Sequence, residues 1–237
     1  MIETALLIAV SYLWGAVPTT YLAGRYRMGI DLRQYGSGNV GAANFMAHVG
    51  KKTGFILGAF DCLAKGSAPL LIARLLDQGA GVQMGMGLAA IAGHNWSPYL
   101  RFTGGRGVAT AVGVVLGALM WPEFLILTVV MGGLGYLIFK ESGFWTFISL
   151  LILPVLAFLF GREPEIFYMT IGIGALLIGK RLTSNWESPA AGISLIRVMV
   201  YRALWDRDVP RKGQWTQRGP MTGEDSLSRD VGDHVLR

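Results

Sequence analysis

Three short clusters of glycine, polar and charged residues interrupt an otherwise apolar sequence, and their side chains are of the kinds that bind anions. The first cluster is YGSGNVGAAN, residues 35–44. Glycines let the backbone approach a ligand closely, and hydroxyl and amide side chains can donate hydrogen bonds to a phosphate or a carboxylate. A helix that begins near Val40 would add free N–H groups and the positive end of its dipole. For this stretch alone, an ordinary glycine-rich loop is an equal alternative. The residues expected to contribute are Gly36, Ser37, Gly38, Asn39, Gly41 and Asn44.

The second cluster is DCLAKG, residues 61–66, in which Asp61 and Lys65 lie four residues apart. This spacing puts the carboxylate and the ammonium on one face of a helix. The helix is expected to lie in a bilayer, where ionisable groups are costly and usually functional. Lys65 would point at a substrate phosphate while Asp61 orients it. The alternative is an ion pair that satisfies itself and pins two helices together.

The third cluster lies in GHNWSPYLRFTGGRGVATAVG, residues 93–113, where glycines surround one arginine just before a helix. Backbone amides, a cation and a hydroxyl converge in this stretch, as they do in an anion cradle. The residues expected to form the cradle are Gly104, Gly105, Arg106, Gly107 and Thr110.

His94 begins the same stretch and is the best candidate for proton transfer, because imidazole has an unperturbed pKa near neutrality. A lone histidine is more often a structural residue. His48 and His234 do not form a metal triad with it, and Cys62 has no Cys or His at metal-ligand spacing. The sequence has no Ser-His-Asp order and no His-x-x-x-x-Asp acyltransferase signature. We therefore expect no metal, no cofactor and no serine hydrolase mechanism.

The composition indicates a membrane protein. Hydrophobic residues make up 52% of the 237 residues and charged residues 15%, and the mean hydropathy is +0.46, whereas about 25% of a soluble domain is charged. A bilayer crossing needs about 20 apolar residues. The sequence predicts an all-α, polytopic bundle with about seven transmembrane helices, or five if the short fourth one does not cross. The predicted spans are residues 3–23, 53–76, 80–97, 107–120, 122–139, 143–160 and 164–181.

Basic residues between the spans predict the orientation. Lysine and arginine gather between the first and second, third and fourth, and fifth and sixth spans, which should therefore face the cytoplasm. The N-terminus would lie outside and the C-terminus inside a plasma (inner) membrane, with all three clusters on the cytoplasmic side, where they could form one site. Residues 1–182 would be the transmembrane domain. Residues 183–237 would be a basic tail, amphipathic enough at first to lie on an anionic leaflet and then flexible. This distribution accounts for the net charge of +6, so nucleic acid is not an expected partner.

In order and spacing, these clusters resemble those of the bacterial membrane glycerol-3-phosphate acyltransferases of the PlsY type, over roughly residues 8–185. The resemblance rests on YLWGAVP, DLRQYGSGNVGAAN, DCLAKG, GHNWSPYLRFTGGRGVAT, and Asn185 after the last span. It implies an enzyme that transfers a fatty acyl group from acyl phosphate to sn-glycerol 3-phosphate. The products would be lysophosphatidic acid, an intermediate of phospholipid synthesis, and phosphate. Both substrates and membrane lipids are the implied partners.

The resemblance also implies roles for the matching positions. Phosphate would be held by Lys65 and Arg106, with Asp61 beside them, and His94 would orient or deprotonate the acceptor hydroxyl. That hydroxyl would attack the acyl carbonyl and phosphate would leave without an acyl-enzyme, and a donor phosphate could serve as the base instead. The other positions that the resemblance assigns to the site are Ser37, Asn39, Asn44, Arg181 and Asn185.

Several positions depart from the family's pattern. Ala43 stands where the family usually has threonine, Ala47 and Ser188 where it has arginine, Leu182 where it has histidine, and Arg106 where it has lysine. Arginine keeps the charge of lysine, but the other changes remove two cations and an imidazole. A divergent paralogue with another phosphorylated acceptor, or without activity, is therefore an alternative. A transporter of phosphorylated solutes is another, although we find no internal repeat. A purely structural membrane protein would explain the glycine-rich helix faces but not three clusters on one side.

Overall fold

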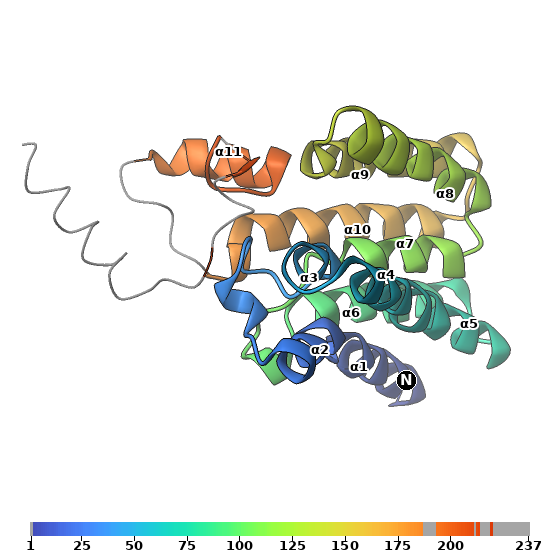
Figure 1. Ribbon diagram of the computed structural model, residues 1–237. Helices are drawn as coiled ribbons and strands as arrows, with labels where there is room; N and C mark the ends of the chain where they lie inside the picture. The colour runs from blue at the N-terminus through green and yellow to red at the C-terminus, as the bar shows by residue number, and fades with distance from the viewer. Residues whose placement is uncertain (1, 187–192, 211, 214–218, 220–237) are drawn as a thin grey trace, which may run out of the picture.

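The computed structural model describes residues 2–186, 193–210, 212–213 and 219, which form helices joined by short loops (Figure 1). Within these residues, extended pairing is limited to one isolated bridge between Ser97 and Thr103. Five described segments are long and apolar enough to cross a membrane. The expected all-helical membrane architecture is thus confirmed. The five segments are Ile2–Met28, Lys51–Leu75, Trp121–Ile138, Ser142–Leu159 and Pro164–Trp186.

The helices follow one another with few intervening residues. The first half of the chain contains α1 (Ile2–Ala16), α2 (Thr19–Met28), the 3-10 turn η1 (Leu32–Gln34), α3 (Ala42–His48), α4 (Lys51–Phe60), the π-helical η2 (Asp61–Ser67), α5 (Ala68–Leu75) and α6 (Ala80–Asn95). The second half contains the 3-10 turn η3 (Pro98–Leu100), α7 (Val108–Gly117), α8 (Trp121–Thr128), the π-helical η4 (Val129–Ile138), α9 (Ser142–Leu159), α10 (Pro164–Thr183), the 3-10 turn η5 (Ser184–Trp186) and α11 (Leu195–Trp205).

Two of the seven predicted spans are short in the structure. Helix α6 has 16 residues and α7 has 10, which correspond to about 24 Å and 15 Å at a rise of about 1.5 Å per residue. A typical hydrocarbon core is about 30 Å thick. By length alone the structure supports five crossings, and the prediction of seven and the predicted orientation of the termini remain predictions.

Prolines alter two of the long segments. Pro18 has φ −87° and ψ 66°, so the first predicted span is broken between α1 and α2, and the carbonyl of Val17 lies at the break. Pro69 lacks the N–H that would bond to the carbonyl of Lys65 four residues earlier. The helix widens into η2 just before it, where the N–H of Ala68 bonds to the carbonyl of Leu63. Widened turns of this kind are frequent at functional sites.

Two pairs of elements touch through their backbones. A Cβ atom on Gly15 of α1 would overlap the carbonyl of Ala90 in α6, and one on Gly113 of α7 would overlap the carbonyl of Cys62 in η2. Small residues allow such close approach between membrane helices. These contacts fix η2 and the end of α6 relative to their neighbours.

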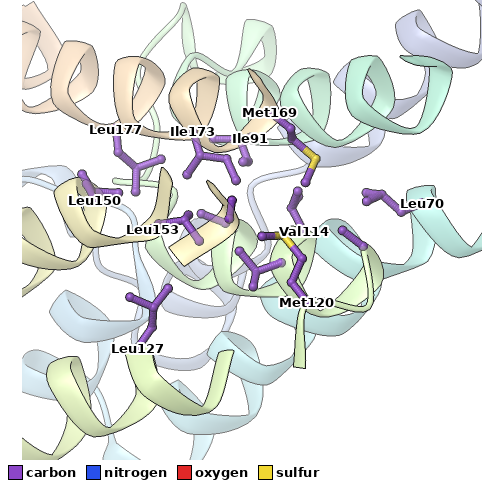
Figure 2. Close-up of a cluster of buried hydrophobic side chains, with 14 residues drawn as sticks. Leu70, Ile91, Val114, Met120, Leu127, Leu150, Leu153, Met169, Ile173 and Leu177 are labelled. Atoms are coloured by element: carbon purple, nitrogen blue, oxygen red, sulfur yellow. The ribbon is translucent and has the colours of Figure 1, made fainter. Parts of the chain in front are cut away.

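The main apolar core lies between α7, α9 and α10, with contributions from α5, α6 and α8 (Figure 2). In Figure 1, α10 runs through the middle of the molecule, with α8 and α9 on one side of it and α1 and α2 on the other. In the turn before α10, Arg162 binds both carboxylate oxygens of the fully buried Glu123 of α8, at 2.6 and 2.7 Å. The core side chains labelled in Figure 2 are Leu70, Ile91, Val114, Met120, Leu127, Leu150, Leu153, Met169, Ile173 and Leu177.

Arginines hold α11 against the bundle. Arg181 of α10 donates hydrogen bonds to the carbonyl of Ala203 at 2.8 Å and to that of Gly143 at 3.0 Å. Arg202 of α11 donates in return to the carbonyl of Leu182 at 3.0 Å. The expected amphipathic segment is thus a helix that packs on α9 and α10, and its contact with a lipid leaflet remains a prediction. Its exposed apolar side chains include Leu195, Ile196 and Val200.

Candidate active site

Asp61 and Lys65 form a buried ion pair in η2. The Lys65 Nζ lies 2.6 Å from the Asp61 Oδ1, and both side chains are at most 2% exposed. The hydroxyl of Thr19 donates to the same Asp61 oxygen at 3.0 Å and accepts from Lys65 at 3.0 Å. Lys65 also donates to the carbonyl of Val17 at 2.6 Å. An ammonium has three N–H donors, so a substrate phosphate that binds Lys65 must replace one of these partners.

His94 lies beside this ion pair at the end of α6. Its Nδ1 is 4.0 Å from the Asp61 Oδ2, close enough for the carboxylate to favour a proton on Nδ1. Its other ring nitrogen, Nε2, faces Gly105, where a Cβ atom would overlap it. The second cluster and the histidine are therefore brought together, and glycine at position 105 lets the imidazole pack directly against the backbone.

The glycine stretch of the third cluster is folded back against the end of α6. The N–H of Gly105 donates to the carbonyl of His94 at 3.0 Å. Asn185 binds both polar backbone groups of Gly104, since its Oδ1 accepts from the N–H at 3.0 Å and its Nδ2 donates to the carbonyl at 3.3 Å. Gly107 has φ +73°, a conformation in which glycine is favoured, and α7 begins directly after it. Asn185 therefore holds Gly104 in place, and its predicted role toward substrate remains a prediction.

Arg106 points away from His94, toward the end of α10. Its Nε lies 2.7 Å from the Oδ1 of Asp206, although the two groups are not aligned as a hydrogen bond. Its Nη1 and Nη2 make long hydrogen bonds of 3.3 Å to the carbonyl of Lys180 and 3.5 Å to the hydroxyl of Ser184. The guanidinium is therefore held by the last span and by the residue after α11. Binding of phosphate by Arg106 remains a prediction.

The first cluster forms a loop that Asn44 holds together. The Nδ2 of Asn44 lies within 3.2 Å of three carbonyl oxygens, those of Leu32, Tyr35 and Asn39. This amide is therefore committed to the backbone of its own loop, and its predicted contact with substrate has no support in these bonds. The Asn39 Oδ1 is buried without a hydrogen-bond partner among the described residues. Gly36 and Gly38 have positive φ angles, 54° and 67°, and the chain turns at both residues.

Other residues of the first and third clusters have less specific surroundings. Ser37 is half-buried in the loop, and α3 begins after Gly41, close to the predicted helix start at Val40. Thr110 is fully buried, and its hydroxyl has no partner among the described residues. Arg181 holds α11 as described above. The roles predicted for these side chains remain predictions, and Ser188 lies outside the described residues.

An ion pair fixes the start of the first loop. Asp31 and Arg33 approach to 2.6 Å, and hydrogen bonding to Arg33 lowers the pKa of the Asp31 carboxyl below its usual value of 3.8. The same pair raises the pKa of Arg33. Asp31 is therefore charged throughout the neutral range, and its ion pair with Arg33 fixes the segment that precedes the loop of residues 35–44.

Two cavities adjoin these groups. One, of about 10 Å³, is bounded by Lys65, His94, Gly104, Gly105 and Val40 among others, so it joins all three clusters. The other, of about 210 Å³, is apolar and lies between α7, α8, η4, α9 and α10. Val108, two residues after Arg106, is part of its wall. A small polar space and a larger apolar one thus lie on either side of the third cluster.

Three residues at the site were not among those expected from the sequence. The hydroxyl of Thr19 links the Asp61–Lys65 pair to the break after α1. Asp206 supplies a carboxylate to Arg106 from beyond the last span. Lys180 is fully buried beside Asn185. From the sequence, Lys180 looks like an ordinary cation at the end of a membrane span. Nothing in the neighbouring residues indicates that its side chain is buried.

Comparison with known proteins places these observations in a family. The family model of glycerol-3-phosphate acyltransferases matches residues 5–192. A protein of Dehalococcoides mccartyi named glycerol-3-phosphate acyltransferase 5 is 36% identical over 228 residues, which are 93% of this chain and 96% of that protein. The glycerol-3-phosphate acyltransferase of Trichlorobacter lovleyi is 39% identical over 193 residues, 76% of this chain and 94% of that one.

Solved structures agree with this similarity. The crystal structure of PlsY, described as an integral membrane glycerol 3-phosphate acyltransferase, in its glycerol 3-phosphate form matches with a TM-score of 0.70 and 32% identity. The match covers 76% of this chain and 88% of that one. A lysophosphatidic acid form of PlsY matches with a TM-score of 0.66 and 29% identity over the same shares.

Proposed function

The chain belongs to the glycerol-3-phosphate acyltransferase family, and from this premise we propose that it acylates sn-glycerol 3-phosphate with an acyl phosphate as donor. It is a membrane acyltransferase of phospholipid synthesis, and its product is lysophosphatidic acid. The observation that carries the proposal is the buried Asp61–Lys65 pair beside His94. In the chain, only Gly104 and Gly105 separate Arg106 from the backbone that packs on His94, and Asn185 holds this short stretch in place.

The chemistry that this arrangement supports needs no covalent enzyme intermediate. The acceptor hydroxyl oxygen forms a bond to the acyl carbonyl carbon, and the bond from that carbon to the phosphate oxygen breaks. The hydroxyl proton passes to His94 or to an oxygen of the leaving phosphate. Because phosphate is a good leaving group, orientation of the two substrates and stabilisation of the developing oxyanion can supply most of the rate.

His94 is suited to orienting the acceptor hydroxyl. With a proton on Nδ1 toward Asp61, the lone pair would be on Nε2, which packs directly against the backbone of Gly105. A substrate hydroxyl would donate to Nε2 once the glycine stretch or the ring shifts to admit it. Lys65, on the other side of Asp61, would bind phosphate oxygens after exchanging one of its three partners, for example the carbonyl of Val17.

The apolar cavity suits the acyl chain of the donor. It lies between four membrane-spanning or apolar segments, and its wall begins two residues after Arg106. An acyl phosphate placed with its tail in this cavity would present its phosphate near the third cluster. The acceptor would come from water, so both substrates would meet at the end of the bundle.

The polar cavity is too small for the acceptor as it stands. Its volume of about 10 Å³ is close to the room that one water molecule requires. The loop of residues 35–44 closes the cavity through Val40, and it is held mainly by the hydrogen bonds of Asn44. We therefore expect this loop to move outward when glycerol 3-phosphate binds.

The arrangement in the membrane follows from the same elements. We propose seven crossings, in which α6 and α7 cross although they are short, because the loop between them is packed inside the protein at residues 94–107. The N-terminus would lie outside, and the C-terminus and the site would face the cytoplasm, where basic residues gather. The membrane would be the plasma (inner) membrane, and soluble glycerol 3-phosphate would reach the site from the cytoplasm.

A direct assay tests the proposal. Purified protein in detergent would be given palmitoyl phosphate and sn-glycerol 3-phosphate, and lysophosphatidic acid and phosphate would be measured together. We expect equal amounts of both products, and loss of both in Lys65→Ala and His94→Ala but not in Lys52→Ala, which removes an exposed lysine of α4. Phosphate without lysophosphatidic acid would refute the acceptor. Activity only with acyl thioesters would refute the donor.

A further inference from the structure

Lys180 is a buried cation whose charge no carboxylate balances at close range. Its side chain is fully buried at the end of α10, and among the described residues no Asp or Glu lies within 4.0 Å of its Nζ. Lysine is almost never fully buried unless it is paired. The ammonium instead donates to the carbonyl of Asn95 and, at 2.6 Å, to the Oδ1 of Asn185, and it lies 5.4 Å from the centre of the Trp96 ring.

These contacts connect Lys180 to the catalytic elements without placing it among the reacting groups. Asn95 follows His94 directly in the chain, so the bond to its carbonyl fixes the end of α6. The Oδ1 of Asn185 that accepts from Lys180 also accepts from the N–H of Gly104. One ammonium therefore holds the histidine-bearing helix end and the amide that supports the glycine stretch.

The position of Lys180 also affects Arg106. The carbonyl of Lys180 accepts a hydrogen bond from the Arg106 Nη1 at 3.3 Å. If Lys180 shifted, the guanidinium would lose one of its three contacts, and the glycine stretch would lose the support of Asn185. Both flanks of the proposed substrate site thus depend on the same residue.

We propose that Lys180 is a positioning residue for acyl transfer, which acts through Asn185 to hold Gly104 and Gly105 against His94. This proposal rests on the proposed function, since it assigns a further residue to the same site. An ammonium donor matters here because a charge-assisted hydrogen bond holds the shared Asn185 oxygen more strongly than a neutral donor does.

A double-mutant cycle tests the proposal. The variants are Lys180→Met, Asn185→Ala and the two combined, with the exposed Lys52→Met as the matched control. We expect Lys180→Met to lower kcat/KM for sn-glycerol 3-phosphate about ten- to hundredfold, the effect of losing one charge-assisted hydrogen bond. The KM for acyl phosphate should change less than about twofold. In the Asn185→Ala background, Lys180→Met should cost less than it does in the wild type, because its route through Asn185 is already lost and only its bond to the Asn95 carbonyl remains.

The conservative variant separates positioning from a general loss of structure. Lys180→Gln keeps a donor for Asn185 without the charge, so its activity should lie between those of the wild type and Lys180→Met. If Lys180→Met does not fold in detergent, as judged by thermal unfolding, Lys180→Gln takes its place in the cycle. Wild-type kcat/KM in a folded Lys180 variant, or losses that simply multiply in the double variant, would overturn the proposal. An inactive wild type would refute the proposed function instead.

Discussion

The buried pair can stabilise the fold, bind substrate, or do both. The exchange of Asp61 for asparagine, alone and together with Lys65→Met, separates these two roles. Asp61→Asn leaves the ammonium of Lys65 buried beside Thr19 and the Val17 carbonyl, without its carboxylate at 2.6 Å. Removal of one partner of a buried pair lowers the free energy of unfolding by about 3–5 kcal/mol. Replacement of both partners by groups of similar volume is often neutral, so the double variant should recover most of that stability.

Activity should follow a different pattern from stability. Asp61 faces His94 as well as Lys65, so Asp61→Asn removes the charge that orients both groups. The loss of one charge-assisted interaction corresponds to about ten- to hundredfold in rate. The double variant also lacks the proposed phosphate ligand, so its activity should fall further while its stability returns.

The measurement combines thermal unfolding in detergent with the formation of lysophosphatidic acid from palmitoyl phosphate. Lys52→Met controls for a change of lysine to methionine at an exposed position. If the double variant recovers activity together with stability, the pair serves only to pin α1, η2 and α6 together, and our assignment of Lys65 to the substrate is wrong.

Three further substitutions test the surroundings of the site. Gly105→Ala puts a methyl group where the Nε2 of His94 lies, so the ring or the glycine stretch must shift and acyl transfer should fall by at least about tenfold. Unchanged activity in a folded variant would show that this packing is not needed. Asp206→Asn removes the carboxylate that pairs with Arg106. The KM for sn-glycerol 3-phosphate should fall, because an incoming phosphate no longer competes with this carboxylate for the arginine. An increased KM would show that Asp206 is needed to hold the arginine in place. Arg162→Ala leaves the buried carboxylate of its α8 partner without a counter-charge, so the free energy of unfolding should fall by about 3–5 kcal/mol while kcat per folded molecule stays the same. A selective loss of kcat would show that this pair also serves the chemistry.

Hydropathy was a good guide to the long apolar segments, because their composition determines where they can lie. Hydropathy could not reveal that the break at Pro18 belongs to the site. The carbonyl at the break, that of Val17, accepts from Lys65, which lies 48 positions away in the sequence. The widening of η2 follows from Pro69 in retrospect. Proline near a helix start is also common in ordinary helices, so the sequence alone did not require a π-helical turn.

The sequence predicted that the polar clusters would lie together, and the structure brings some of their residues close to one another. His94 and the Asp61–Lys65 pair do meet, and Asn185 supports the third cluster. The Nδ2 of Asn44 bonds to the backbone of its own loop, and its predicted contact with substrate stays a prediction. Amide side chains serve either purpose, and only the folded loop distinguishes them. Lys180 was missed because the positive-inside rule gave a sufficient reason for a cation at that place.

The ion pair between Arg106 and Asp206 has a consequence for the order in which the enzyme is made. The two residues are 100 positions apart, and Lys180 and Asn185 also belong to the last part of the chain. At synthesis rates of about 5–20 residues per second, the ribosome needs about 5–20 s to pass from the arginine to its aspartate. An interrupted chain that ends before α10 therefore carries His94, Asp61 and Lys65 but lacks the supports of its glycine stretch. Only a chain synthesised as far as Asp206 can make all of the contacts described for the proposed site.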